Sequence, residues 1–224
     1  MIDINNLTFS YTNKPPYLID NVNLKIPKGV YLSIVGENGS AKTTLLKLIL
    51  GLLKPTSGTI DVNAKGIAYV PQKLESFNSQ FPISVYEILK THGKSIGVCN
   101  KNEIKKVLDK VNMIEFTNKL IGSLSGGQQQ RIFIARALMG NPELIILDEP
   151  STGVDYKNQS SIYSLLHKLN TENGKTIISV EHNIDMALKY STHILEVING
   201  SPTLYTKEDY LKHRASFDKK ILNL

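Results

Sequence analysis

The feature that most constrains the fold is a glycine loop between a short apolar run and a helical segment. Residues 31–35, YLSIV, end at the loop GENGSAKTT (residues 36–44), and TTLLKLILGLL (residues 43–53) has helical periodicity. The backbone N–H groups of such a loop and the positive end of the following helix favour phosphate. The sequence therefore predicts a strand, a phosphate-binding loop and a helix within an α/β fold.

One residue of this loop departs from the pattern G-x-x-x-x-G-K-[ST]. Gly36, Lys42 and Thr43 satisfy the pattern, but Ala41 stands in place of its last glycine. We expect right-handed helical backbone at Ala41, where alanine costs little in torsion. Its methyl group would face the phosphates, at a cost on the order of 1–3 kcal/mol. The substitution is thus predicted to weaken binding without abolishing it.

Two further motifs follow the loop. The apolar run LIILD (residues 144–148) ends in Asp148, which can hold Mg²⁺ through water, and the next residue, Glu149, can orient an attacking water. The segment LSGGQQQRIFIARAL (residues 124–138) begins a helix in which Ile132, Ala135 and Leu138 recur at helical spacing. A hydroxyl and backbone amides at its start make a second anion site. One chain thus offers two half-sites for phosphate.

These motifs, in this order, resemble those of the ATP-binding cassette (ABC) ATPase family, whose signature is LSGGQ. The resemblance covers about the first 200 residues. It implies a homodimer of ATPase subunits packed head to tail, with each ATP between the phosphate loop of one subunit and the signature of the other. The residues expected to contact ATP in trans are Ser125, Gly126, Gly127, Gln128 and Asp155, the last of which links the two sites.

The same resemblance assigns the remaining site residues one by one. Tyr11 is expected to stack on adenine, and His182 to contact the γ-phosphate. The residues expected to bind ATP are Tyr11, Gly36, Glu37, Asn38, Gly39, Ser40, Ala41, Lys42, Thr43 and Thr44. Those expected to hold Mg²⁺ are Thr43, Gln72 and Asp148, and those expected to act in catalysis are Lys42, Glu149 and His182. ATP and Mg²⁺ are therefore the expected cofactors.

The expected fold is a P-loop NTPase (ABC ATPase) core with a flanking antiparallel β-subdomain and an inserted helical subdomain. Alternating apolar residues near the N-terminus favour a hairpin or small sheet, and continuous apolar runs such as TIISV (residues 176–180) are typical of buried parallel strands. We expect one ABC ATP-binding domain over residues 1–224. Its parts are the RecA-like core and β-layer (1–72 and 123–200), the helical subdomain (about 73–140) and a short tail (201–224), strand then helix.

Composition and apolar runs indicate where the chain works. The formal charge of +6 is modest and the lysines are scattered, so no nucleic acid partner is expected. The single cysteine, Cys99, cannot form an internal disulfide, and the five histidines show no metal-ligand spacing. The longest apolar run is short of the ~20 residues of a membrane span. These features indicate a cytoplasmic chain, and the resemblance to the ABC family implies that it is peripheral at the inner face of the cell membrane.

The stretch YVPQ, followed by FPISVYEIL (residues 81–89), resembles the metal-ion uptake branch of the family. That resemblance implies an importer of zinc, or alternatively manganese, with integral membrane permease subunits as partners and an extracytoplasmic substrate-binding protein as an indirect one. Three alternatives remain open. The chain could serve another cargo, act on ribosomes or DNA without transport, or be a regulator whose hydrolysis Ala41 impairs. The sequence has no sustained heptad pattern, and hence no sign of a long coiled coil, which argues against a role on ribosomes or DNA.

Overall fold

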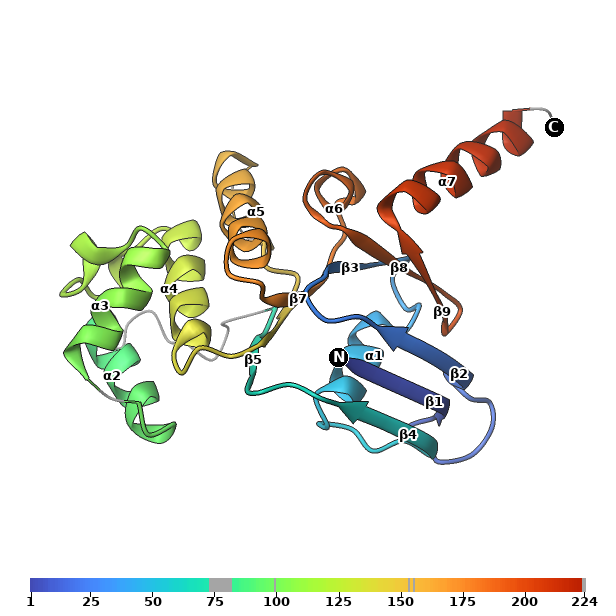
Figure 1. Cartoon of the computed structure of the whole chain (residues 1–224), viewed down its shortest axis with the longest axis horizontal. Coiled ribbons are helices and arrows are strands. Elements are labelled where there is room, and N and C mark those ends of the chain that lie inside the picture. The colour runs from blue at the N-terminus through green and yellow to red at the C-terminus, as the bar shows by residue number, and fades with distance from the viewer. Residues whose placement is uncertain (73–81, 99, 153, 155, 223–224) are drawn as a thin grey trace. The chain divides into compact units, whose positions relative to one another are not determined.

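The computed structural model describes residues 1–72, 82–98, 100–152, 154 and 156–222, and the side chains of these residues except for 156–158 and 217–222 (Figure 1). The chain divides into two compact units, described in turn: Met1–Asn63 with Thr176–Leu224, and Ala64–Lys175. Within the described ranges, no helix combines the length and the apolar character needed to cross a membrane.

The first unit begins with a three-stranded antiparallel sheet. Its strands are β1 (Ile2–Phe9), β2 (Ile19–Ile26) and β4 (Ser57–Val62), in the order β2-β1-β4 (Figure 1). Residues Ile2 and Ile4 of β1 are buried, opposite Ile26 and Leu24 of β2. The antiparallel sheet predicted from the N-terminal alternation is confirmed.

A second sheet of the same unit carries the glycine loop. Strand β3 (Tyr31–Val35) pairs in parallel with β7 (Thr176–Val180) on one side and β8 (His193–Ile198) on the other, and β9 (Ser201–Thr206) is antiparallel to β8. Every residue of β3 and β7 is buried, as expected for covered parallel strands. The helices of this unit are α1 (Lys42–Ile49), α6 (Ile184–Tyr190) and α7 (Lys207–Leu222). The tail is therefore strand then helix, as predicted.

The second unit combines two parallel strands with a group of helices. Strand β5 (Ile67–Val70) pairs with β6 (Leu144–Asp148). The helices are α2 (Val85–Ser95), α3 (Lys101–Lys110), α4 (Gly126–Leu138) and α5 (Tyr156–Thr171), with 3₁₀ turns at Ile114–Phe116 and Ile121–Ser123. Helices α2, α3 and α4 contact one another, as Figure 1 shows. These three helices lie within residues 73–140, where the helical subdomain is predicted.

Two of these helices begin at serine caps that complete capping boxes. Ser84 accepts from the N–H of Glu87, whose carboxylate accepts from the N–H of Ser84 in return. Ser125 and Gln128 form the same reciprocal pair at the start of α4. These caps fix where both helices start, because each satisfies backbone donors that a helix leaves unpaired.

Candidate nucleotide site

The loop predicted to bind phosphate joins β3 to α1 in the first unit. At its first residue, Gly36, φ is 148°, and a Cβ there would lie 2.3 Å from the carbonyl oxygen of Val197 in β8. No side chain fits so close to a backbone atom, so glycine is required. The carboxyl end of β8 thus dictates the first residue of the loop.

Lys42 holds the loop in a curled conformation. Its side chain is only 6% exposed, and Nζ donates to the carbonyl oxygens of Gly36 and Glu37, both at 2.8 Å. The neighbouring Ser40 is buried too, and its Oγ has no hydrogen-bond partner among the described residues. An ammonium group and a buried hydroxyl are therefore concentrated within one short loop at the start of α1.

The backbone at Ala41 contradicts the prediction made for it. Its φ is 81° and its ψ is 15°, so the residue is left-handed rather than right-handed. The reason is geometric: Ala41 is the N-cap of α1, and the chain reverses there between the loop and the first helical residue. A left-handed conformation costs an L-residue roughly 1–2 kcal/mol. The cost of alanine in this loop is therefore torsional, a term that the prediction had dismissed.

Apart from Ala41 and one other residue, left-handed backbone in the described ranges is confined to residue types that tolerate it. Eight non-glycine residues in the described ranges have positive φ, and six of them are asparagine. Asparagine adopts this conformation several-fold more often than most residues do. The two exceptions are Ala41 and Glu149, with φ of 81° and 50°. Both lie in motifs that are predicted to bind and hydrolyse nucleotide, and strained backbone of this kind clusters at functional sites.

Tyr11 and His182 belong to the same unit as the loop. Tyr11 is 66% exposed, its ring edge contacts Phe9 with centroids 5.0 Å apart, and its hydroxyl lies 3.1 Å from Oγ1 of Thr44. This tyrosine is thus tied to α1 with most of its surface accessible, and its adenine contact stays a prediction. His182 is exposed and follows β7, whose carboxyl end meets that of β3 because the two strands are parallel. The histidine therefore lies at the loop's edge of the sheet.

The predicted magnesium and catalytic residues of the second unit meet at the ends of β5 and β6. Val70 pairs with Leu147, so the residues two positions after each of these, Gln72 and Glu149, come together. Nε2 of Gln72 donates to Oε2 of Glu149 at 2.5 Å. Asp148 ends β6 and is 3% exposed.

Two features of this cluster were not predicted from the motifs. Oγ1 of Thr152 donates to Oε2 of Glu149 at 2.9 Å. Burial, and then the charge of Asp148, raises the pKa of Tyr69 in β5. The sequence does show a hydroxyl residue, Thr152, three positions after Glu149, but no role was assigned to it.

The signature residues occupy the start of α4, as predicted. Ser125 and Gly126 are exposed there, whereas Gly127 is buried within the helix. The apolar positions Ile132, Ala135 and Leu138 are all buried, which confirms the helical pattern. Contact of the signature with a partner's ATP stays a prediction. Asp155 lies outside the described residues, as does Phe81 of the FPISVYEIL segment.

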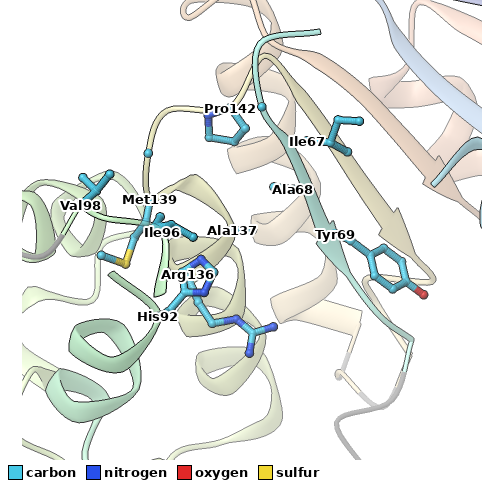
Figure 2. A pocket seen from close by; sticks show the side chains of 12 residues that line it. Ile67, Ala68, Tyr69, His92, Ile96, Val98, Arg136, Ala137, Met139 and Pro142 are labelled. Carbon is cyan, nitrogen blue, oxygen red and sulfur yellow. The ribbon is translucent and has the colours of Figure 1, made fainter. Parts of the chain in front are cut away.

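A cavity of about 330 Å³ lies within the second unit, between β5 and the ends of α2 and α4 (Figure 2). Its walls include the apolar side chains of Ile67, Ile96 and Met139, and Arg136 and His92 bring positive or ionisable groups. None of the described residues that line it is acidic. Burial lowers the pKa of Arg136, and burial followed by the charge of Arg136 lowers that of His92. The cavity therefore suits a ligand that has both an apolar part and a negatively charged part.

Comparison with known proteins places these features in one family. Residues 19–152 match the family described as ABC transporter. The chain is 42% identical over 217 residues to a "Probable metal transport system ATP-binding protein" of Treponema pallidum, covering 97% of this chain and 91% of that one. It is 38% identical to "Zinc uptake system ATP-binding protein ZurA" of Listeria monocytogenes, with 88% and 82% of the two chains covered.

Two further similarities concern a second metal and a dimer. "Manganese transport system ATP-binding protein MntB" of Bacillus subtilis is 36% identical, with 87% of this chain and 82% of that chain covered. A solved dimeric structure of the ATP-binding cassette MJ0796, in a post-hydrolysis state bound to ADP and Pi, superposes with a TM-score of 0.72. It is 32% identical and covers 92% of this chain and 99% of that chain.

Proposed function

Because this chain belongs to the ABC transporter family, as one of its ATP-hydrolysing subunits, we propose that it drives uptake of a metal ion, zinc ahead of manganese. The observation that carries the proposal is 42% identity, over 97% of the chain, to a relative named for metal transport. A relative named for zinc and one named for manganese are almost equally similar to this chain, with identities of 38% and 36%. That closeness supports a divalent metal as cargo and keeps both metals in the test.

The first unit is proposed to bind the phosphates of ATP. Backbone N–H groups of the loop and the N-terminal end of α1 attract the anionic phosphates, and Lys42 exchanges its carbonyl acceptors for phosphate oxygens. Tyr11 is proposed to stack on adenine, and His182 to contact the γ-phosphate. The exposure of both side chains supports these roles.

The donor set of the chain fits Mg²⁺. The Thr43 hydroxyl, the Gln72 amide oxygen and the Asp148 carboxylate are hard oxygen ligands of the kind this ion prefers. Asp148 is almost wholly buried, and a buried carboxylate needs a cation or hydrogen-bond donors to offset its desolvation. When bound, the ion would neutralise charge on the phosphates.

Glu149 is proposed to orient the water that attacks the γ-phosphate. The water oxygen bonds to phosphorus as the bond to the bridging oxygen breaks, ADP leaves with the electron pair, and the water proton passes to the carboxylate. Lys42 stabilises the developing negative charge. Glu149→Gln should therefore bind ATP but not hydrolyse it.

The active assembly is proposed to be a homodimer. Residues Ser125, Gly126, Gly127 and Gln128 would contact the partner's ATP, and Asp155 would link the two sites. Support comes from the exposed cap of α4 and from the dimeric cassette that the chain resembles. An exposed helix N-terminus is a suitable anion site once a second subunit supplies the anion.

The cavity of the second unit is proposed to bind a segment of the permease. This contact would hold the subunit at the inner face of the membrane. Arg136 lies over the Phe133 ring, 5.1 Å from its centroid, and no described residue forms an ion pair with it. Apolar walls and an uncompensated guanidinium complement a permease segment with an apolar side chain and a carboxylate. Arg136→Glu should release the chain from membranes, whereas Arg136→Lys should keep it there.

Transport in the producing cell tests the cargo. Zinc and manganese uptake would be measured after starvation for each metal, in cells that lack the gene and in cells that carry the native gene or Glu149→Gln. We expect zinc uptake to fall, to recover with the native gene and not to recover with the variant. Unchanged uptake of both metals in the deletion strain would rule out metal import.

A further inference from the structure

The chain immediately after Glu149 forms a tight turn. The N–H of Thr152 donates to the carbonyl oxygen of Glu149 at 3.1 Å, which closes a four-residue turn. Pro150 occupies its second position, where the fixed φ of proline is favourable. This turn brings the Thr152 side chain back beside the Glu149 carboxylate.

The turn is anchored to helix α5, within the same unit. The Tyr163 hydroxyl donates to Oγ of Ser151 at 2.9 Å, and Tyr163 is only 1% exposed. Nε2 of Gln159 donates to the carbonyl oxygens of Ser151 and Val154, at 3.3 and 2.8 Å. Because α5 contacts Ser151 within the turn twice and Val154 just after it once, the position of residue 152 is set by packed protein rather than by a free loop.

Two donors converge on one oxygen of Glu149. Oε2 accepts from Oγ1 of Thr152 at 2.9 Å and from Nε2 of Gln72 at 2.5 Å. An ionised carboxylate can only accept, so the amide nitrogen of Gln72 must face it and the amide oxygen points elsewhere. Threonine, branched at Cβ, has few χ1 rotamers and so holds its hydroxyl in place. With Oε2 fixed twice, the carboxylate plane is fixed, and so is the direction that Oε1 presents.

We propose that Thr152 is a positioning residue that orients the Glu149 carboxylate toward the attacking water. This inference rests on the proposed role of Glu149. Thr152 itself need not touch ATP or water, because it acts through the carboxylate. Since positioning matters in the transition state and not in nucleotide binding, its loss should lower kcat and leave the KM for ATP unchanged.

The test compares ATP turnover of the full-length chain with that of Thr152→Val, Thr152→Ser and the control Thr203→Val. Valine has the shape of threonine without the hydroxyl, serine keeps the hydroxyl, and Thr203 is an exposed residue of β9. Loss of one hydrogen bond to a charged group predicts a fall in kcat of about tenfold for Thr152→Val. The KM and the Kd for ATP should not change, and the kcat of the serine and control variants should stay within about twofold of native.

Two outcomes would overturn the proposal. One is a kcat of Thr152→Val within about twofold of native, and the other is a serine variant as slow as the valine variant. Undiminished turnover of Glu149→Gln alone would refute the assigned base instead, and unchanged metal uptake would refute the cargo while leaving the kinetic comparison intact.

Discussion

Ala41→Gly is predicted to stabilise the protein, in contrast to most alanine-to-glycine changes. Ala41 has a φ of 81°, and left-handed backbone costs an L-residue roughly 1–2 kcal/mol that glycine avoids. Glycine also has more conformational freedom in the unfolded chain, which offsets roughly 0.4–1 kcal/mol of this stabilisation. The net gain in unfolding free energy is thus about 0.5–1 kcal/mol, or a rise in Tm of about 1–4 °C for a chain of this size.

Thermal unfolding followed by circular dichroism, without nucleotide, measures this effect. Ala215→Gly is the matched control, because Ala215 is exposed in the right-handed helix α7. There glycine should lower the unfolding free energy by roughly 0.5–1 kcal/mol. Shifts of opposite sign support the torsional argument. If Ala41→Gly lowers Tm as Ala215→Gly does, the left-handed backbone at Ala41 is not a source of strain and the reasoning is refuted.

Three further predictions concern other parts of the fold. Gly36→Ala should lower the unfolding free energy by about 2 kcal/mol or more and prevent ATP binding, because the new Cβ would lie 2.3 Å from the Val197 carbonyl oxygen; thermal unfolding and ATP titration check this. Tyr210→Phe should cost about 1 kcal/mol in urea unfolding, since it removes the hydroxyl that donates to Glu196 at 3.2 Å; an unchanged midpoint would contradict this. Burial lowers the pKa of His92, so as pH falls through 6.5 the unfolded chain binds a proton before the folded one does. Stability should therefore decline from pH 7.5 toward the lower folded pKa, and His92→Asn should show a smaller decline when Tm is measured across that range.

The buried strands could be predicted from the sequence residue for residue. The runs YLSIV, LIILD and TIISV coincide with β3, β6 and β7. Apolar residues on both faces of a strand give a continuous run with clear ends, where glycine or acidic residues begin. The starts of α2 and α4 were equally readable, because a serine cap acts on backbone groups only two or three residues away.

The details of the site that escaped prediction depend on contacts between distant segments. The backbone torsion of Ala41 depends on the conformation of the whole loop. That loop also accepts a hydrogen bond from Lys42 and approaches the Val197 carbonyl closely, and residue propensities alone do not predict such contacts. The Thr152 contact requires α5 to hold the turn through Tyr163, which lies twelve residues from Ser151. A motif thus specifies which residue types bind nucleotide, whereas the packing around it determines their conformations.

The most direct test of the central claim is Mg²⁺-dependent ATP turnover by the purified chain, measured beside Ala41→Gly and Glu149→Gln. Our account predicts turnover by the native chain, loss of turnover with Glu149→Gln, and turnover at least as fast with Ala41→Gly, since the alanine strains the loop without disabling it. Absence of turnover in the native chain, with recovery only in Ala41→Gly, would contradict the claim that this loop is a working ATPase site.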